Sequence, residues 1–285
     1  MPFTNTFIVS CRAVSMLIIL LAAYGLSVET FSYKSIFIGL LFSHFAYGLY
    51  YSKNNVSLIK EKKYALILAT VVLLTGLYFS VYATHYAPHF LLIHVALSDA
   101  YLLTIRTRLK DPEYMALLRT VFYIACGGLV FFDIPQTATA GFLIIGLISF
   151  VAILYYTKDR TTLSLFELPL VALVAYAQLT QTSLHFHFMG FYHIVTWYGF
   201  SFWMLFVKEK DIKKTVSFFS KVFALSAAFV FLFSSVLGLS ITDQSFFKII
   251  AFWSILHIFS SIPLSKFNPR FLKNLFYVSK KATAP

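Results

Sequence analysis

Long apolar segments follow one another along almost the whole chain, separated by short polar stretches. The hydrocarbon core of a bilayer is about 30 Å thick, so a crossing helix needs roughly 20 apolar residues. Ten segments approach this length, at 7–27, 35–52, 64–83, 85–105, 116–134, 137–157, 163–181, 185–207, 216–238 and 245–262. The pattern therefore predicts an all-α, polytopic membrane helix bundle. We expect one integral membrane domain over 1–285, with a basic tail at 263–285.

Composition supports this class and excludes others. The mean hydropathy is +0.79, 59% of the residues are hydrophobic and 12% are charged. A water-soluble domain carries about twice that share of charged residues, so a soluble enzyme, a nucleic-acid-binding domain and a disordered chain are excluded. Cys11 and Cys126 both lie in apolar segments and are too few for a disulfide framework or a thiolate metal site.

The basic residues predict the orientation of the bundle, because cytoplasmic loops retain lysine and arginine. Twenty of the 23 lie on alternate connections or in the tail, in five groups: 53–63, 106–119, 158–160, 208–221 and 266–281. Both termini are therefore predicted to be cytoplasmic, and the net charge of +12 reflects topology first and attraction to membrane lipid second. The compact, loop-poor build suggests a bacterial inner membrane.

All the histidines fall within the predicted spans rather than in the charged loops. They are His44, His85, His89, His94, His185, His187, His193 and His257. The four spans that carry them run in the same direction, and His44 and His94 lie near the span centres. His193 and His257 lie roughly 5 Å from their centres at 1.5 Å of rise per residue. Ionisable groups inside a membrane are costly and by default mark a functional site.

Four imidazoles at similar depth suit a transition metal better than calcium or magnesium. The predicted ligands are His44, His94, His193 and His257, with His187 and His89 as possible additional ligands. Iron(II) is the first choice, because a redox metal in hydrocarbon suits O₂ chemistry on a lipophilic small molecule; zinc is the alternative. The structural alternative is that each histidine bonds singly to a neighbouring helix.

Two carboxylates also lie within the predicted spans. Asp99 follows His94 by five residues and is the predicted catalytic group, orienting a metal-bound histidine on another helix. A simple ion pair between Asp99 and Arg12 is an equal alternative. Glu167 is predicted to extend to the cytoplasmic interface.

The histidine segments resemble a known family. His44–Tyr47, His94–Asp99, His187–His193 and His257–Phe259 have the order and approximate spacing of the histidine segments in Brp/Blh-type bacterial β-carotene 15,15′-dioxygenases. The resemblance implies a multi-pass membrane enzyme whose histidine-bound iron(II) uses O₂ to cleave β-carotene into two retinals. The chain departs from the family at His44, which lacks a P-H-G-x-x-D motif, at the wider spacing within 187–193, and in having no aspartate after His257.

Two other functions fit the same pattern. Ten spans with polar residues near the midplane are also typical of a transporter or lipid-translocating protein, with His94 and Asp99 on the path. The segment Gly39–Tyr50 and the run Leu97-Ser98-Asp99 are similar to stretches of the lysoplasmalogenase family, which implies a membrane hydrolase.

Overall fold

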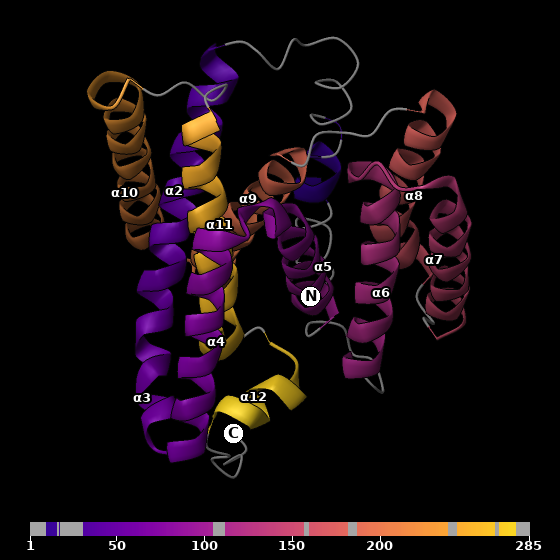
Figure 1. Ribbon diagram of the computed structural model, residues 1–285, viewed down its shortest axis with the longest axis horizontal. Helices are drawn as coiled ribbons and strands as arrows, with labels where there is room; N and C mark the ends of the chain where they lie inside the picture. The colour runs from indigo at the N-terminus through magenta and orange to yellow at the C-terminus, as the bar shows by residue number, and fades with distance from the viewer. Residues whose placement is uncertain are drawn as a thin grey trace. The chain divides into compact units, whose positions relative to one another are not determined.

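The computed structural model describes residues 10–15, 17, 31–104, 112–156, 160–181, 187–238, 244–265 and 268–277. Every element in this part of the chain is helical (Figure 1). The α-helices are α2 Phe31–Ser52, α3 Val56–Lys60, α4 Lys63–Tyr82, α5 Ala87–Thr104, α6 Pro112–Phe131, α7 Gln136–Tyr156, α8 Arg160–Thr180, α9 His187–Phe202, α10 Ile212–Phe231, α11 Gln244–Leu264 and α12 Arg270–Phe276. Short 3₁₀ turns are η1 Lys53–Asn55 and η2 Thr84–Tyr86, and the π-helical turns η3 Trp203–Lys208 and η4 Leu232–Val236 extend α9 and α10.

The predicted all-α class is confirmed, and helices occupy nine of the ten predicted ranges. The remaining range, 7–27, lies largely outside the described residues. Within the described part, four helices are long and apolar enough to cross a membrane: Lys63–Tyr82, Glu113–Phe131, Gln136–Tyr156 and Ile212–Val236. Shorter apolar helices cover Phe37–Tyr50, Glu167–Thr180 and Lys248–Leu264. These helices are those of an integral membrane protein, while the number of crossings stays a prediction.

The chain forms two compact units, each assembled from two separate stretches of sequence. Unit 1 comprises Met1–Ser43 and Val95–Gly238, and unit 2 comprises His44–His94 and Leu239–Pro285. Helices α2 and α5 each contribute to both units, because the divisions fall within them. We describe the two units separately.

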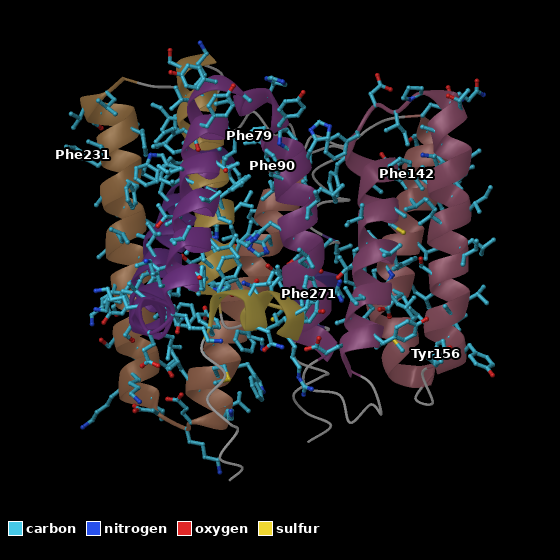
Figure 2. The ribbon with its side chains drawn as sticks, turned by 60° about the horizontal axis from the view of Figure 1, so that its bottom comes forward. Phe79, Phe90, Phe142, Tyr156, Phe231 and Phe271 are labelled. Atoms are coloured by element: carbon cyan, nitrogen blue, oxygen red, sulfur yellow. The ribbon has the colours of Figure 1, made fainter. Side chains whose placement is uncertain are left out.

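In unit 1, helix α6 packs against both α7 and α8 (Figure 1). A glycine on α6 allows close contact with α7: a Cβ at Gly128 would lie 2.6 Å from Cε1 of Phe142, a ring labelled in Figure 2. Phe122 of α6 stacks on Phe150 of α7 with ring centroids 5.7 Å apart. The other sides of α7 expose large apolar residues such as Leu147 and Ile148, as expected of a lipid-facing helix.

In unit 2, helix α4 packs along α11, and α12 contacts both (Figure 1). Gly76 allows the close approach, since a Cβ there would overlap the Cβ of Phe259. Phe79 and Phe90, labelled in Figure 2, pack together with ring centroids 5.1 Å apart, and Phe90 also lies 5.1 Å from Phe259. Aromatic packing therefore joins α4, α5 and α11 on this side of the unit.

Candidate functional site

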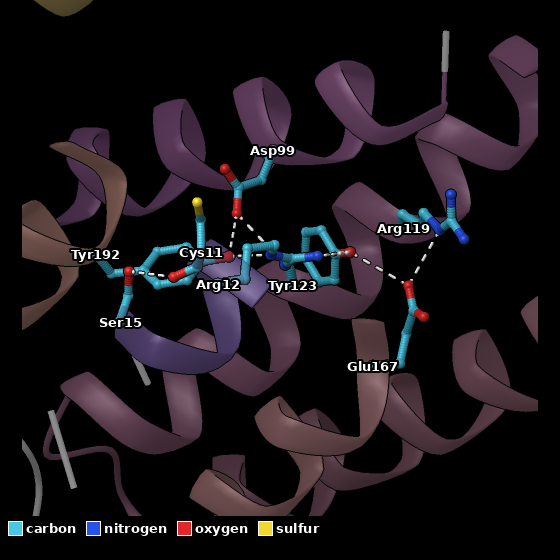
Figure 3. Close-up of polar contacts among 8 residues, drawn as sticks. All are labelled: Cys11, Arg12, Ser15, Asp99, Arg119, Tyr123, Glu167 and Tyr192. Atoms are coloured by element: carbon cyan, nitrogen blue, oxygen red, sulfur yellow. Dashed lines mark hydrogen bonds and ion pairs between the residues drawn. The ribbon is translucent and has the colours of Figure 1, made fainter. Parts of the chain in front are cut away.

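Four charged side chains in unit 1 are almost completely buried. The exposed fraction is 4% for Arg12, 3% for Asp99, 1% for Arg119 and 0% for Glu167. They come from four parts of the chain, namely the helical segment 10–15, α5, α6 and α8. A buried charge is costly unless it is paired, and these four form two ion pairs. Nη2 of Arg12 lies 3.4 Å from Oδ2 of Asp99, and Nε of Arg119 lies 3.1 Å from Oε1 of Glu167 (Figure 3).

Two tyrosine hydroxyls join the ion pairs into one network. Arginine nitrogens can only donate hydrogen bonds, which fixes the direction of each bond. Arg12 donates through Nε to the hydroxyl of Tyr192, and that hydroxyl donates to Oδ2 of Asp99 at 2.5 Å. Through Nη1, Arg12 donates to the hydroxyl of Tyr123 at 3.3 Å. The Tyr123 hydroxyl in turn donates to Oε1 of Glu167 at 3.2 Å (Figure 3). Arg12 thus connects to both carboxylates.

We call this set the buried ionic network; its members are Arg12, Asp99, Arg119, Tyr123, Glu167 and Tyr192. Its charged groups alternate in sign, in the order Asp99, Arg12, Glu167, Arg119, and their formal charges sum to zero. The second carboxylate oxygen of Glu167 is buried and accepts no hydrogen bond from the described residues. The network can therefore hold ionised groups inside an apolar helix bundle and has one acceptor position still open.

The network shows one of the two roles predicted for Asp99. The ion pair with Arg12 is confirmed. The described partners of the Asp99 carboxylate are Arg12 and the hydroxyl of Tyr192, and no histidine is among them. Its catalytic role as the orienting group of a metal-bound histidine stays a prediction.

The prediction that the side chain of Glu167 extends out to the aqueous interface is wrong. Its side chain is fully buried and paired with Arg119, which was counted among the loop charges. The reason is that α6 begins at Pro112 rather than at residue 116, so Arg119 lies about two turns inside the helix. The sequence signal for this ion pair was Arg119, an arginine inside an apolar segment. No local pattern indicated that its partner is Glu167, 48 residues away.

In unit 2, three histidines pack ring against ring. The imidazole of His257 on α11 lies 5.0 Å from that of His44 on α2 and 5.3 Å from that of His94 on α5, measured between ring centroids. His44 is only 3% exposed. Gly48 makes room for this arrangement, since a Cβ there would lie 2.7 Å from Cε1 of His257.

The hydrogen bonds around His94 assign its tautomer. The hydroxyl of Ser261 has one proton and donates it to the carbonyl oxygen of Ile258 at 2.7 Å. The same hydroxyl lies 3.3 Å from Nδ1 of His94, so it accepts a hydrogen bond from that nitrogen. In this arrangement a neutral His94 carries its proton on Nδ1.

Three of the four predicted metal ligands lie together within one unit. His44, His94 and His257 lie together in unit 2, whereas His193 is buried in unit 1 on α9, 7% exposed. Within the ranges described, no group of three or more His, Cys, Asp or Glu side chains is placed to hold a metal ion. Iron or zinc as the cofactor stays a prediction.

The remaining histidines lie apart from these clusters or outside the description. His85 and His89 are exposed beside Tyr86, with ring centroids 4.1 Å and 6.1 Å from the tyrosine ring. His187 is the first residue of α9, and its side chain lies outside the described part, as does the whole of His185.

No protein-family model, curated protein or solved structure matches this chain. The functional argument therefore depends on the geometry of the two units.

Proposed function

We propose that this protein is a transporter of the bacterial cytoplasmic membrane, with ten spans and both termini in the cytoplasm. In this proposal the buried ionic network of unit 1 binds the polar part of the substrate. The observation that supports it is a set of two ion pairs, joined by two tyrosine hydroxyls, that draws on helices α5, α6, α8 and α9 and on Arg12. Ionisable groups within membrane helices pair with one another and mark substrate or proton pathways.

A purely structural role explains the network less well. Replacing a buried ion pair by apolar side chains of similar volume is often neutral, or stabilising by about 1–4 kcal/mol, so such a pair is a poor means of holding helices together. The network contains two pairs and leaves an oxygen of Glu167 without a described donor. Because these buried polar groups add little stability, their presence favours a role in binding a substrate.

Reconstitution tests the proposal. Purified protein in liposomes is incubated with a mixture of polar metabolites, and the trapped solutes are identified by mass spectrometry. A phospholipid with a fluorescent headgroup, bleached from outside by dithionite, tests lipid translocation in the same vesicles. We expect Asp99→Asn to abolish transport and Glu209→Gln, which changes a carboxylate at the exposed end of η3, to preserve it. If neither solute nor lipid moves, the proposal fails.

A metal-dependent enzyme acting on a lipophilic substrate, such as a carotenoid-cleaving dioxygenase, is the second candidate. The grouping of His44, His94 and His257 favours it. Elemental analysis of purified protein and the loss of β-carotene absorbance under O₂ test this reading. His94→Ala should remove both metal and activity, while His85→Ala, at an exposed position, should remove neither. Protein without bound transition metal excludes this candidate. A lysoplasmalogenase-like hydrolase has no further support here.

A further inference from the structure

The two oxygens of the Glu167 carboxylate are in different situations. Oε1 accepts hydrogen bonds from Nε of Arg119 at 3.1 Å and from the hydroxyl of Tyr123 at 3.2 Å. Oε2 is equally buried and accepts none from the described residues. In Figure 3 the contacts of Glu167 all converge on one oxygen, and the other points away from both donors.

This asymmetry matters because an ionised carboxylate spreads its charge over both oxygens. A charged oxygen without a donor, in a site closed to water, carries a desolvation cost that pairing at the other oxygen removes only in part. Binding a proton at Oε2 removes the charge and leaves both hydrogen bonds at Oε1 in place. The open oxygen is therefore suited to taking up and releasing a proton.

We propose that Glu167 is the proton-binding group of the buried ionic network, and that its protonation prepares the network to bind an anionic solute. The inference rests on the proposed transport function and names its substrate class. With Glu167 ionised, the four charged groups sum to zero. With a proton from the aqueous phase on Oε2, they sum to +1, and an anion restores neutrality in the low-dielectric interior.

Among the charged and titratable groups that surround Glu167, Glu167 itself is the one suited to bind and release the proton. Arg119 and Tyr123 face it from α6, and Arg12 acts on it from the segment 10–15. Arginine stays protonated, so it cannot supply the switch. Helix α7, which also packs against α8, has no Asp, Glu, His, Lys or Arg; its titratable residues, Tyr155 and Tyr156, are exposed at its end. Asp99 also takes its contacts with Arg12 and Tyr192 on one oxygen, Oδ2, but its other oxygen, unlike Oε2 of Glu167, is not a buried atom without a described partner.

Infrared difference spectroscopy of full-length protein in liposomes tests the proton site. Lowering the pH should produce the carbonyl stretch of a protonated, buried carboxyl group in the native protein. We expect Glu167→Gln to abolish this band, and Asp99→Asn and Glu209→Gln to retain it. Since Glu167→Gln removes the ion pair that Arg119 makes with Glu167, the double variant Arg119→Gln/Glu167→Gln serves as a better folded form that must also lack the band. A native protein without the band, or a band that survives in either Glu167 variant, overturns the proposal.

The anion is tested in the same samples with succinate and inorganic phosphate as probes. At fixed pH, either anion should increase the carboxyl band of the native protein and leave both Glu167 variants unchanged. If neither increases it, the link between proton and anion is wrong. Transport without the carboxyl band refutes the proton site and leaves the transporter standing. A band without transport of any solute refutes the transporter and the coupling, and leaves Glu167 as a proton site.

Discussion

At the scale of single residues, the question is why charged groups persist in an apolar bundle. Arg12 and Asp99 contact each other and share the hydroxyl of Tyr192, so each relieves the desolvation cost of the other. Their direct attraction is strong in a low dielectric, but the net gain over apolar side chains is small. Removing one partner therefore does far more harm than removing the whole set.

We predict that Arg12→Met or Asp99→Leu alone lowers the free energy of unfolding by about 3–5 kcal/mol, because an unpaired charge stays buried. The triple variant Arg12→Met/Asp99→Leu/Tyr192→Phe should be more stable than either single variant. Denaturant unfolding in detergent measures the difference. As a control, Lys214→Met breaks an exposed pair with Glu209 and should cost no more than about 1 kcal/mol. Single variants that cost as little as this control would contradict the description of the network.

At the scale of elements, helix contacts in this chain depend on individual glycines rather than on a repeated small-residue motif. Gly76 of α4 lies against Phe259 of α11, and Gly48 of α2 lies against the ring of His257. A side chain at either position would have to displace an aromatic or imidazole ring. By contrast, Gly141 on α7 has open space where a Cβ would lie.

We predict opposite effects for the same substitution at two glycines. Gly76→Ala should destabilise the protein by about 1–3 kcal/mol, since the packing of α4 on α11 must open. Gly141→Ala should be neutral or stabilise it by about 0.5–1 kcal/mol, because alanine reduces the entropy lost in forming a helix. Thermal unfolding of both variants in one detergent provides the comparison. Equal effects at the two sites would mean that Gly76 does not lie in a tight contact.

Helix α10 begins with a side-chain cap. Oδ1 of Asp211 accepts a hydrogen bond from the backbone nitrogen of Lys214 at 2.8 Å. We predict that Asp211→Ala costs about 1 kcal/mol and that Asp211→Asn, which keeps the acceptor, costs less than half of that. Chemical unfolding of the two variants measures this. An Asn variant as unstable as the Ala variant would show that the charge of Asp211, rather than the cap, stabilises the helix.

At the scale of the whole molecule, the distribution of basic residues predicts which connections face the cytoplasm. The α9–α10 connection is rich in lysine, while the α6–α7 connection contains Asp133 and no basic residue. Consecutive connections must lie on opposite sides of the membrane if each helix crosses it once, and three helices, α7, α8 and α9, separate these two connections. The orientation can therefore be tested with two single positions.

In a variant whose two native cysteines are replaced by alanine, we predict that Asp133→Cys reacts with a membrane-impermeant maleimide in intact cells. Lys213→Cys, at the start of α10, should react only after the membrane is permeabilised. Both positions are exposed, so access depends on topology rather than on burial. The reverse labelling pattern would place both termini outside the cell. Labelling of both cysteines in intact cells would show that the chain does not cross the membrane an odd number of times between these two positions.

The sequence by itself determined the helical class and the approximate helix ranges, because apolar length and the lack of breakers are local properties of the chain. It also indicated that His94, Asp99 and Arg12 are intramembrane polar groups, and it gave the Arg12–Asp99 pair as one of two alternatives. Only the tertiary structure decided the partners: Glu167 with Arg119, 48 residues apart, and Tyr192 with Arg12, 180 residues apart. The physical reason is that hydrophobicity acts residue by residue along the chain, whereas a buried charge is satisfied by whichever distant helix brings the opposite charge to it.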